Sequence, residues 1–367
     1  MDMLKQTYQI PTLPPPGKLE TKAVLKLAAV AHRYLAELKG RAATIPNQGI
    51  LIDTLSLQEA KASSEIENIV TTQDELFQAT LFPEHPSSAA AKEVALYRDA
   101  LRCGLAELAG KQGIISNTSI IAMFRILKRT DGTFRTLPGT ALKNDQSGEI
   151  VYVPPQSGDD VIRHMTALEK FINDDSYKQL DPLVRMAIVH HQFESIHPFP
   201  DGNGRLGRII NVLYLVQQGL LDIPILYLSR YITAHKGDYY RQLQAVRATG
   251  NWEPWLLYML SAVAETSAQT IDLIAGIRIL MAEYKDKIRT EHAKIYSQDL
   301  LNNLFRHPYT RIDYVVDELG VSRQTAAKYL DQLAAAGLLV KHQSGRNVYF
   351  INMPLMDLFR KGEGGAA

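Results

Sequence analysis

The sequence has little of what marks secreted, membrane-spanning or nucleic-acid-coating proteins. Its 367 residues include one cysteine, Cys103, so no internal disulfide can form; we interpret it as a small buried apolar residue. The N-terminus has an early acid and a proline cluster instead of an apolar signal-peptide core. No apolar run reaches the length of about 18 residues that spans a bilayer. The formal net charge is +1, so no overall basic field attracts nucleic acid. We expect a cytoplasmic protein.

Apolar residues recur at helical spacing along most of the chain, which predicts an all-α fold class. The predicted helices cover residues 19–38, 51–68, 89–109, 116–128, 161–173, 182–193, 206–219, 233–249 and 252 through the 260s, followed by a charged amphipathic stretch at 271–296.

Residues 131–158 interrupt the helices. Strand-like alternation at 149–153 and turn-forming residues at 144–148 predict a small β-hairpin over 140–153, ended by two prolines. A lone two-stranded ribbon is marginal in water, so a loop packed on the helices is the alternative. If the hairpin forms, its edge could accept the backbone of another chain.

The end of the chain has a different pattern. A short helix at 311–319, a turn, a helix at 323–336 capped by Ser322, and strands at 338–342 and 347–351 resemble a winged helix-turn-helix domain of bacterial regulators. Arg323, Lys328 and Lys341 could contact DNA, although nearby acidic residues dilute the positive charge. Winged helices also bind proteins, so both kinds of partner stay open.

The segment HPFPDGNGRLGR, residues 197–208, carries the strongest chemical signal. Arg205 and Arg208 are three residues apart and share one face of a first helical turn, where the macrodipole is already positive. A strongly anionic partner makes this arrangement favourable. The glycines of Gly202-Asn203-Gly204 permit the close backbone approach of an anion-binding nest. These features predict a seat for two or three phosphates.

Two further residues of the segment add chemistry to this seat. Asp201 would repel phosphates unless a hard cation lay between them, which makes it a candidate Mg²⁺ ligand. His197 has an ordinary pKa near neutrality and suits general base catalysis. No P-loop or protein-kinase signature is present. The bland alternative is a capped helix with a surface ion-pair cluster.

The segment resembles the core motif HPFx[D/E]GNGRxxR of the Fic family, position for position. The similarity extends from about residue 91 to residue 265 and includes YVPP at 152–155 and YYxxL at 239–243. Together with the two flanking regions, the chain resembles the longer bacterial members. The resemblance implies a protein adenylyltransferase, which moves AMP from ATP to a Ser, Thr or Tyr hydroxyl of a target and releases pyrophosphate.

The family roles can be carried over residue by residue. His197 would accept the proton of the target hydroxyl, Asp201 would hold Mg²⁺, and Phe199 would anchor the loop. The resemblance assigns ATP and its phosphates to Gly202, Asn203, Gly204, Arg205, Leu206, Gly207 and Arg208. It also implies that Tyr152 and Val153 belong to a flap that aligns the target backbone. Tyr240 would lie against the base or ribose, with a packed aromatic as the alternative.

The segment SSEIEN, residues 63–68, suggests a switch. Leu57, Ala60, Ser64 and Glu67 share one helical face, and Ser63 lies one turn before Glu67, where it could support the carboxylate. By itself the segment could be a solvated acidic helix end. The resemblance implies otherwise, because SSEIEN fits the inhibitory pattern [S/T]xxxE[G/N]. In such proteins the glutamate pairs with the second arginine of the core motif, here Arg208, and obstructs the γ-phosphate.

The resulting prediction divides the chain into an N-terminal helical region with an inhibitory helix (1–90), a Fic core (91–270), a connecting helix (271–299) and a winged-helix domain with tail (300–367). We expect ATP and Mg²⁺ as cofactors, an unidentified target protein, self-modification, and no membrane partner; a homodimer is open. Two rival functions remain: a DNA-binding regulator without catalysis, and a Fic enzyme that removes AMP or transfers another phosphate-containing group.

Overall fold

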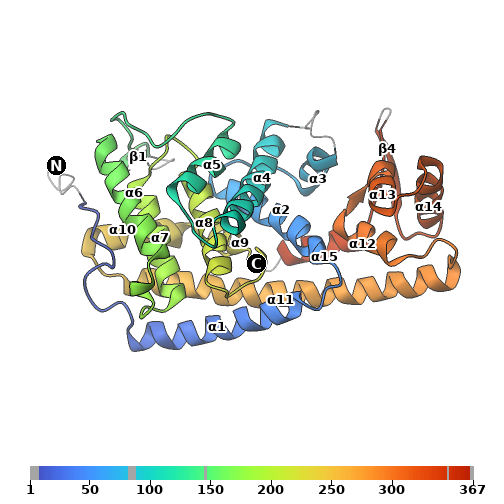
Figure 1. Ribbon diagram of the computed structural model, residues 1–367, viewed down its shortest axis with the longest axis horizontal. Helices are drawn as coiled ribbons and strands as arrows, with labels where there is room; N and C mark the ends of the chain where they lie inside the picture. Colours follow the sequence, from blue (N-terminus) through green and yellow to red (C-terminus); the bar gives the residue numbers. More distant parts are fainter. Residues whose placement is uncertain (1–7, 82–87, 144–146, 345–346, 364–367) are drawn as a thin grey trace.

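The computed structural model describes residues 8–81, 88–143, 147–344 and 347–363, and these are mostly helical (Figure 1). The helices of its first part are α1 (Lys22–Ala42), α2 (Gly49–Ile66), α3 (Gln73–Leu81), α4 (Ala89–Gly110), α5 (Asn117–Lys128), α6 (Gly158–Asn173), α7 (Pro182–Ile196), α8 (Asn203–Gln217), α9 (Leu228–Ala234) and α10 (Lys236–Thr249). They are followed by α11 (Glu253–Glu291), α12 (Gln298–Arg306), α13 (Ile312–Leu319), α14 (Arg323–Ala335) and α15 (Met353–Glu363). No helix among the described residues is long and apolar enough to cross a membrane.

The centre of the fold is the pair α7 and α8. Every residue of α7 from Leu183 to Ile196 is buried, and α8 is buried from Arg205 to Leu215. A helix that is buried on all sides cannot shift without disturbing its neighbours on every face. The loop of residues 197–202 joins these two helices, so the segment singled out in the sequence is anchored between two buried helices.

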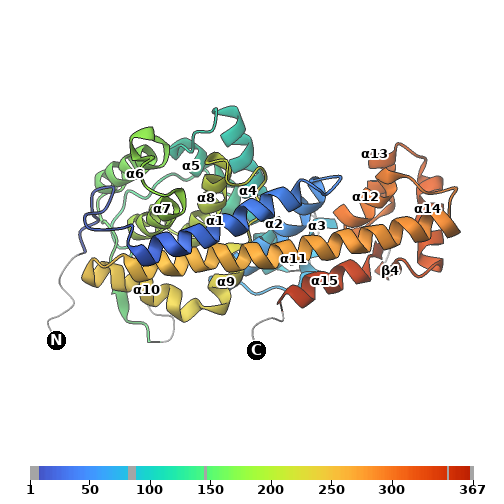
Figure 2. The same cartoon turned by 90° about the horizontal axis from the view of Figure 1, so that it is seen from below.

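Helices α1 and α11 form a long pair that runs along one side of this centre. Helix α1 lies along α11 in both views (Figures 1 and 2). The buried residues of α1 alternate at spacings of four and three, which places them on one face. At the start of both helices, Thr21 Oγ1 donates a hydrogen bond to Glu253 Oε1 at 3.0 Å, so the two helices run in the same direction.

Helix α11 corrects one sequence prediction. Residues 253–291 form a single helix of 39 residues, where the sequence suggested two stretches, one from 252 through the 260s and one at 271–296. Gly276 lies inside it without ending it. A Cβ at this position would lie 3.1 Å from Leu358 Cδ2 of α15, so the glycine permits close packing between the two helices. Helices α3, α9, α12 and α15 were not predicted.

The C-terminal part contains a three-stranded sheet formed by β3 (Tyr309–Thr310), β4 (Val340–Ser344) and β5 (Asn347–Ile351), in the order β3-β5-β4 with antiparallel pairing. The predicted helices at 311–319 and 323–336 are confirmed as α13 and α14, and Ser322 caps α14 through the Thr325 N–H at 3.2 Å.

This part packs against the N-terminal helices as well as on α11. Phe77 of α3 stacks on Tyr309 of β3 with ring centroids 5.4 Å apart. Arg306 of α12 donates to Asp53 of α2 at 2.6 Å, and Arg311 Nη1 donates to the Leu81 carbonyl at 2.8 Å. Helix α12 is therefore tied to α2, the helix that carries Ser63, whereas β3 and Arg311 are tied to α3.

The predicted hairpin is present as β1 (Leu142–Lys143) paired antiparallel with β2 (Ile150–Tyr152), with an irregular register. Residues 144–146 of its predicted turn lie outside the described residues. Gln244 of α10 donates a hydrogen bond to the Val151 carbonyl, which ties the hairpin to the helical body.

Candidate active site

The loop that begins at His197 is held by an arginine that sequence reasoning missed. The backbone N–H of Arg135 donates to the Pro198 carbonyl at 2.8 Å, and its Nε donates to the His197 carbonyl at 2.8 Å. Its Nη2 reaches the Ile196 carbonyl at 3.2 Å. These bonds satisfy carbonyls that the end of α7 leaves without helical partners. They fix a strained position, since His197 has a left-handed φ of 50°.

Two side chains within the segment also fix the loop. Phe199 is buried and stacks on Phe124, with ring centroids 4.0 Å apart, as the anchoring role requires. The Asn203 amide accepts from the Phe199 N–H at 2.9 Å and donates to the Phe199 carbonyl at 2.8 Å. The Asn203 side chain is therefore committed to loop structure, and only its backbone N–H is left to contact an anion.

The electrostatic surroundings of His197 favour its neutral form. Burial, together with the positive charges of Arg135 and Arg247, lowers the pKa of His197 to about 4. An imidazole with this pKa is unprotonated at neutral pH and can accept a proton. His190 and His191 on α7 are buried in the core, where His190 Nε2 lies 2.8 Å from the Tyr239 hydroxyl.

Helix α8 starts with the geometry expected of an anion site. Gly202, its N-cap residue, has a φ of 80°, which favours glycine, and the first-turn N–H groups of α8 follow it. The Leu206 N–H is already used, because it donates to the Gly202 carbonyl at 3.0 Å. Within the described residues, Arg205 Nε and Arg208 Nη1 are buried without a hydrogen-bond partner. Buried donors of this kind are costly unless a ligand satisfies them.

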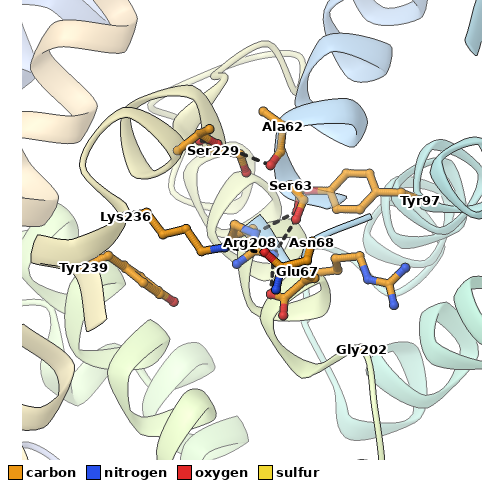
Figure 3. Close-up of polar contacts among 12 residues, drawn as sticks. Ala62, Ser63, Glu67, Asn68, Tyr97, Gly202, Arg208, Ser229, Lys236 and Tyr239 are labelled. Carbon is orange, nitrogen blue, oxygen red and sulfur yellow. Dashed lines mark hydrogen bonds and ion pairs between the residues drawn. The ribbon is translucent and has the colours of Figure 1, made fainter. Parts of the chain in front are cut away.

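Helix α2 holds Arg208 through three hydrogen bonds (Figure 3). Arg208 Nε donates to Ser63 Oγ at 2.7 Å. Arg208 Nη2 donates to the Ser63 carbonyl at 2.8 Å and to Glu67 Oε1 at 2.8 Å. The guanidinium is 1% exposed and the Glu67 side chain 34% exposed. The sequence analysis predicted that Ser63 supports the Glu67 carboxylate. In the structure both residues instead accept hydrogen bonds from Arg208.

The backbone around this contact explains two residue choices. Asn68 follows Glu67 with a φ of 61°, a left-handed conformation that glycine and asparagine adopt most readily at helix ends. This accounts for the [G/N] position of the inhibitory pattern. A Cβ on Gly204 would collide with the Glu67 carboxylate, so the glycine lets Glu67 approach the first turn of α8.

Glu93 and Lys128, which the sequence analysis did not identify as site residues, connect Arg205 to Asp201. Arg205 Nη1 lies 2.7 Å from Glu93 Oε1, on α4, and the same Glu93 oxygen lies 3.1 Å from Lys128 Nζ at the end of α5. Lys128 Nζ lies 2.5 Å from Asp201 Oδ2. Although burial raises it, hydrogen bonds from Arg205 and Lys128 bring the pKa of Glu93 below its ordinary value.

The protein ligands available at this site fit Mg²⁺ only if a bound phosphate supplies further oxygen ligands. Asp201 is a single, largely exposed carboxylate, and the described residues contain no cluster of three or more acidic, histidine or cysteine side chains that could hold a metal. Mg²⁺ is commonly bound by one or two carboxylates plus substrate phosphates and water. The two unpartnered arginine nitrogens lie in the same segment, so the residues present fit a metal-bound polyphosphate.

The residues predicted to contact the target and the base lie on β2, directly after it, and on α10. Tyr152 is buried, its hydroxyl donates to the Ser195 carbonyl at 2.7 Å, and Arg247 lies over its ring at 3.8 Å. Val153 is exposed next to it, and Tyr240 is 44% exposed beside the buried Tyr239.

Gly207 packs on α7, because a Cβ there would lie 2.9 Å from Glu194 Oε1.

Three family models match the chain. Residues 25–106 match the model described as "Fic/DOC family N-terminal", residues 115–215 match "Fic/DOC family", and residues 280–355 match "Protein adenylyltransferase SoFic-like, C-terminal domain". The match to the "Fic/DOC family" model includes the hairpin, the loop of residues 197–202 and most of α8.

The chain is also similar to individual proteins. It is 47% identical over 57 residues to a probable protein adenylyltransferase of Aquifex aeolicus, covering 16% of this chain and 18% of that protein. It is 30% identical over 122 residues to the protein adenylyltransferase fic-1 of Caenorhabditis elegans, covering 33% and 22%. The chain thus matches about a fifth of the length of these curated relatives.

Two solved structures share the fold. A Fic family protein from Desulfovibrio desulfuricans matches with a TM-score of 0.56 at 21% identity, over 92% of this chain and 98% of that one. Fic-1 from C. elegans matches with a TM-score of 0.54 at 21% identity, over 69% and 74%.

Proposed function

The chain belongs to the Fic/DOC family, and from this premise we propose that it is a protein adenylyltransferase that uses ATP and a divalent cation. The observation that carries the proposal is the combination of a neutral, half-buried His197 with two buried arginine nitrogens at the start of α8 that lack partners among the described residues. A base next to a polyphosphate seat is what nucleotidyl transfer to a hydroxyl requires.

In the proposed reaction, the target hydroxyl oxygen attacks the α-phosphorus of ATP. His197 accepts the hydroxyl proton, the bond between the α-phosphorus and the bridging oxygen breaks, and pyrophosphate leaves. The target side chain then carries AMP through a new phosphoester bond. Arg135 and Asn203 hold the loop so that the imidazole does not have to reorganise.

The phosphates would lie against Arg205, Arg208 and the first-turn N–H groups of α8, where the helix dipole also favours negative charge. Asp201 would hold Mg²⁺ against them. When bound, the cation supplies neutralisation of the charge that develops on the leaving phosphates. Tyr240 offers an exposed ring for the base or ribose, and Ile150, Val151 and Val153 present exposed apolar side chains beside which a target segment can pair.

We propose further that α2 inhibits the transfer. Glu67 and Ser63 occupy the guanidinium of Arg208, which the γ-phosphate would need. A carboxylate and a phosphate compete for the same donor fork, so ATP would bind in a pose that does not react while Glu67 is in place.

The C-terminal part has the helix order and antiparallel sheet of a winged helix-turn-helix domain, and we propose this fold class for the described residues of 300–363. Its charges give modest support to DNA binding, because Arg323 pairs with Asp313 and Lys341 Nζ lies 2.7 Å from Asp331. A salt-sensitive mobility shift with duplex DNA would support it; no shift at low salt would favour a protein partner.

The test of the proposed function compares ATP labelled at the α- or γ-phosphate, with the Glu67→Gly variant as the active form. We expect α-label on protein, including the chain itself, and no γ-label. Transfer of γ-label, or loss of AMP from a modified protein without incorporation, would replace the proposal by one of its rivals. The absence of any label or AMP release would leave the DNA-binding regulator as the better interpretation.

A further inference from the structure

Four side chains of alternating charge form a continuous chain beside the loop. Arg205, Glu93, Lys128 and Asp201 are linked at 2.7, 3.1 and 2.5 Å in that order, and Arg205 Nη2 also lies 4.0 Å from Asp201 Oδ1, so the first and last members are in contact as well. The guanidinium at one end is 1% exposed, whereas the Asp201 carboxylate at the other end is 65% exposed. The chain therefore runs from the protein interior to solvent, and its two ends are residues that the proposed function assigns to phosphate and metal.

The two middle residues carry the charges that a metal-bound phosphate would bring to this site. Glu93 places a carboxylate oxygen on Arg205, where a phosphate oxygen would lie, and Lys128 places a cation on Asp201, where Mg²⁺ would lie. Glu93 and Lys128 also contact each other, as a phosphate and its metal do. In this state the charges of both ends are balanced without nucleotide.

The position of Lys128 allows it to leave. Its aliphatic stem lies over Gly202, where a Cβ would be 3.4 Å from Lys128 Cδ, while its ammonium contacts both carboxylates. A metal ion bound to Asp201 Oδ2 would repel the ammonium that lies 2.5 Å from this oxygen, because like charges at close range repel. Glu93 lies at the other side of the same ammonium and can retain it after Asp201 is taken.

We propose that Lys128 is a positioning residue that occupies Asp201 in the nucleotide-free protein and is displaced onto Glu93 when the divalent cation enters with ATP. This inference rests on the proposed function, since it needs Asp201 to be the metal ligand. It adds a competitor for the metal that is independent of Glu67, because α4 and α5 supply it and α2 does not.

The experiment measures binding of α,β-methylene-ATP, which cannot release pyrophosphate, over Mg²⁺ concentrations from micromolar to millimolar. Calorimetry gives the Mg²⁺ concentration at half-maximal affinity for the wild-type chain, for Lys128→Met and for Lys178→Met. The last variant is a matched control, because Lys178 forms a comparable ion pair with Asp175 at 2.8 Å among exposed residues outside the site.

Without the competing ammonium, Lys128→Met should need about tenfold less Mg²⁺, the factor that corresponds to 1.4 kcal/mol. Lys178→Met should behave as wild type. Glu93→Gln removes the residue that receives the ammonium and should raise the Mg²⁺ requirement, while it strengthens metal-free nucleotide binding by releasing Arg205.

Three outcomes would overturn the inference. An unchanged or raised Mg²⁺ requirement in Lys128→Met, with clear Mg²⁺ dependence in wild type, would remove the role of Lys128 and leave the proposed function intact. An equal fall in Lys178→Met would show a general charge effect instead. If nucleotide binding were independent of Mg²⁺ in all variants, Asp201 would lose its assignment and the proposed function would fall with it.

Discussion

Arg208 is held by one helix through a hydroxyl, a backbone carbonyl and a carboxylate, whereas Arg205 pairs with two carboxylates, those of Glu93 and Asp201. The first arrangement depends on the position of α2 as a whole, because backbone atoms take part. The second uses side chains alone and can be released by rotation of a few bonds. The two arginines of one helical turn are thus controlled in different ways. Arg208 depends on the position of helix α2, and Arg205 depends on ion pairs between side chains.

The largest expected effect comes from His197, which belongs to neither arrangement. In a Glu67→Gly background, His197→Ala should lower α-label incorporation by about 10²- to 10⁴-fold, the usual contribution of a general base. Nucleotide affinity should change little, because His197 does not contact the phosphates in the proposed pose. Quantified label and a calorimetric titration check both statements, and undiminished labelling would remove His197 from the mechanism.

Glu67→Gly tests the control of Arg208. A hydrogen bond to a charged group contributes about 1.5–3 kcal/mol, so its removal should raise α-label incorporation by about ten- to a hundredfold over wild type. Arg208→Ala serves as the control, because it breaks the same contact but also deletes the phosphate donor, and its activity should stay low. Equal incorporation by wild type and Glu67→Gly would contradict inhibition by α2.

These two predictions rely on residues that the sequence itself identified. The loop could be predicted because its functional residues lie within 12 consecutive positions, so local spacing fixes their geometry. Glu67 was predicted through a short motif, and the left-handed Asn68 gives that motif a physical reason. The long helices were predicted for a similar reason, since their apolar spacing repeats over several turns.

Other parts of the site depend on contacts that no local pattern encodes. Glu93 and Arg205 are 112 residues apart, and Lys128 and Asp201 are 73 apart. Arg135 lies in the non-helical region and reaches the loop across 62 residues. Helices such as α9 and α12, with 7 and 9 residues, are too short to show a clear periodicity. Tertiary packing decides these features, so only the structure reveals them.

Ser63→Ala separates the hydroxyl from the carboxylate within the control of Arg208. It removes the bond from Arg208 Nε but keeps the Ser63 carbonyl and Glu67, so incorporation of α-label should rise by about three- to tenfold, less than for Glu67→Gly. Ser64→Ala is a matched control, since Ser64 is equally buried on the same helix and has no side-chain partner among the described residues. Equal gains in both variants would indicate a general loosening of α2.

The smallest expected effect is a difference in the pH dependence of stability between the carboxyl group near Arg208 and the one that pairs with Arg205. Burial raises the pKa of Glu194, near Arg208, to about 7, against the lowering effect of Arg208 itself. Between its unfolded pKa of about 4.3 and this value, the folded protein binds a proton that the unfolded chain does not. The contribution of Glu194 to stability is therefore complete below about pH 4 and is lost as pH rises through 7.

Glu194→Gln lacks this titration, so its melting temperature relative to wild type should rise by a few degrees between pH 5 and pH 8, as about 3 kcal/mol of linkage implies for a large protein. The other buried groups titrate in both proteins and cancel in the difference. Glu93→Gln provides the comparison at Arg205. Because the pKa of Glu93 lies below its ordinary value, the carboxylate is ionised in both folded and unfolded states over this range. Its melting-temperature difference from wild type should stay constant, and a constant difference for Glu194→Gln as well would show that the two arginines do not differ in pH response.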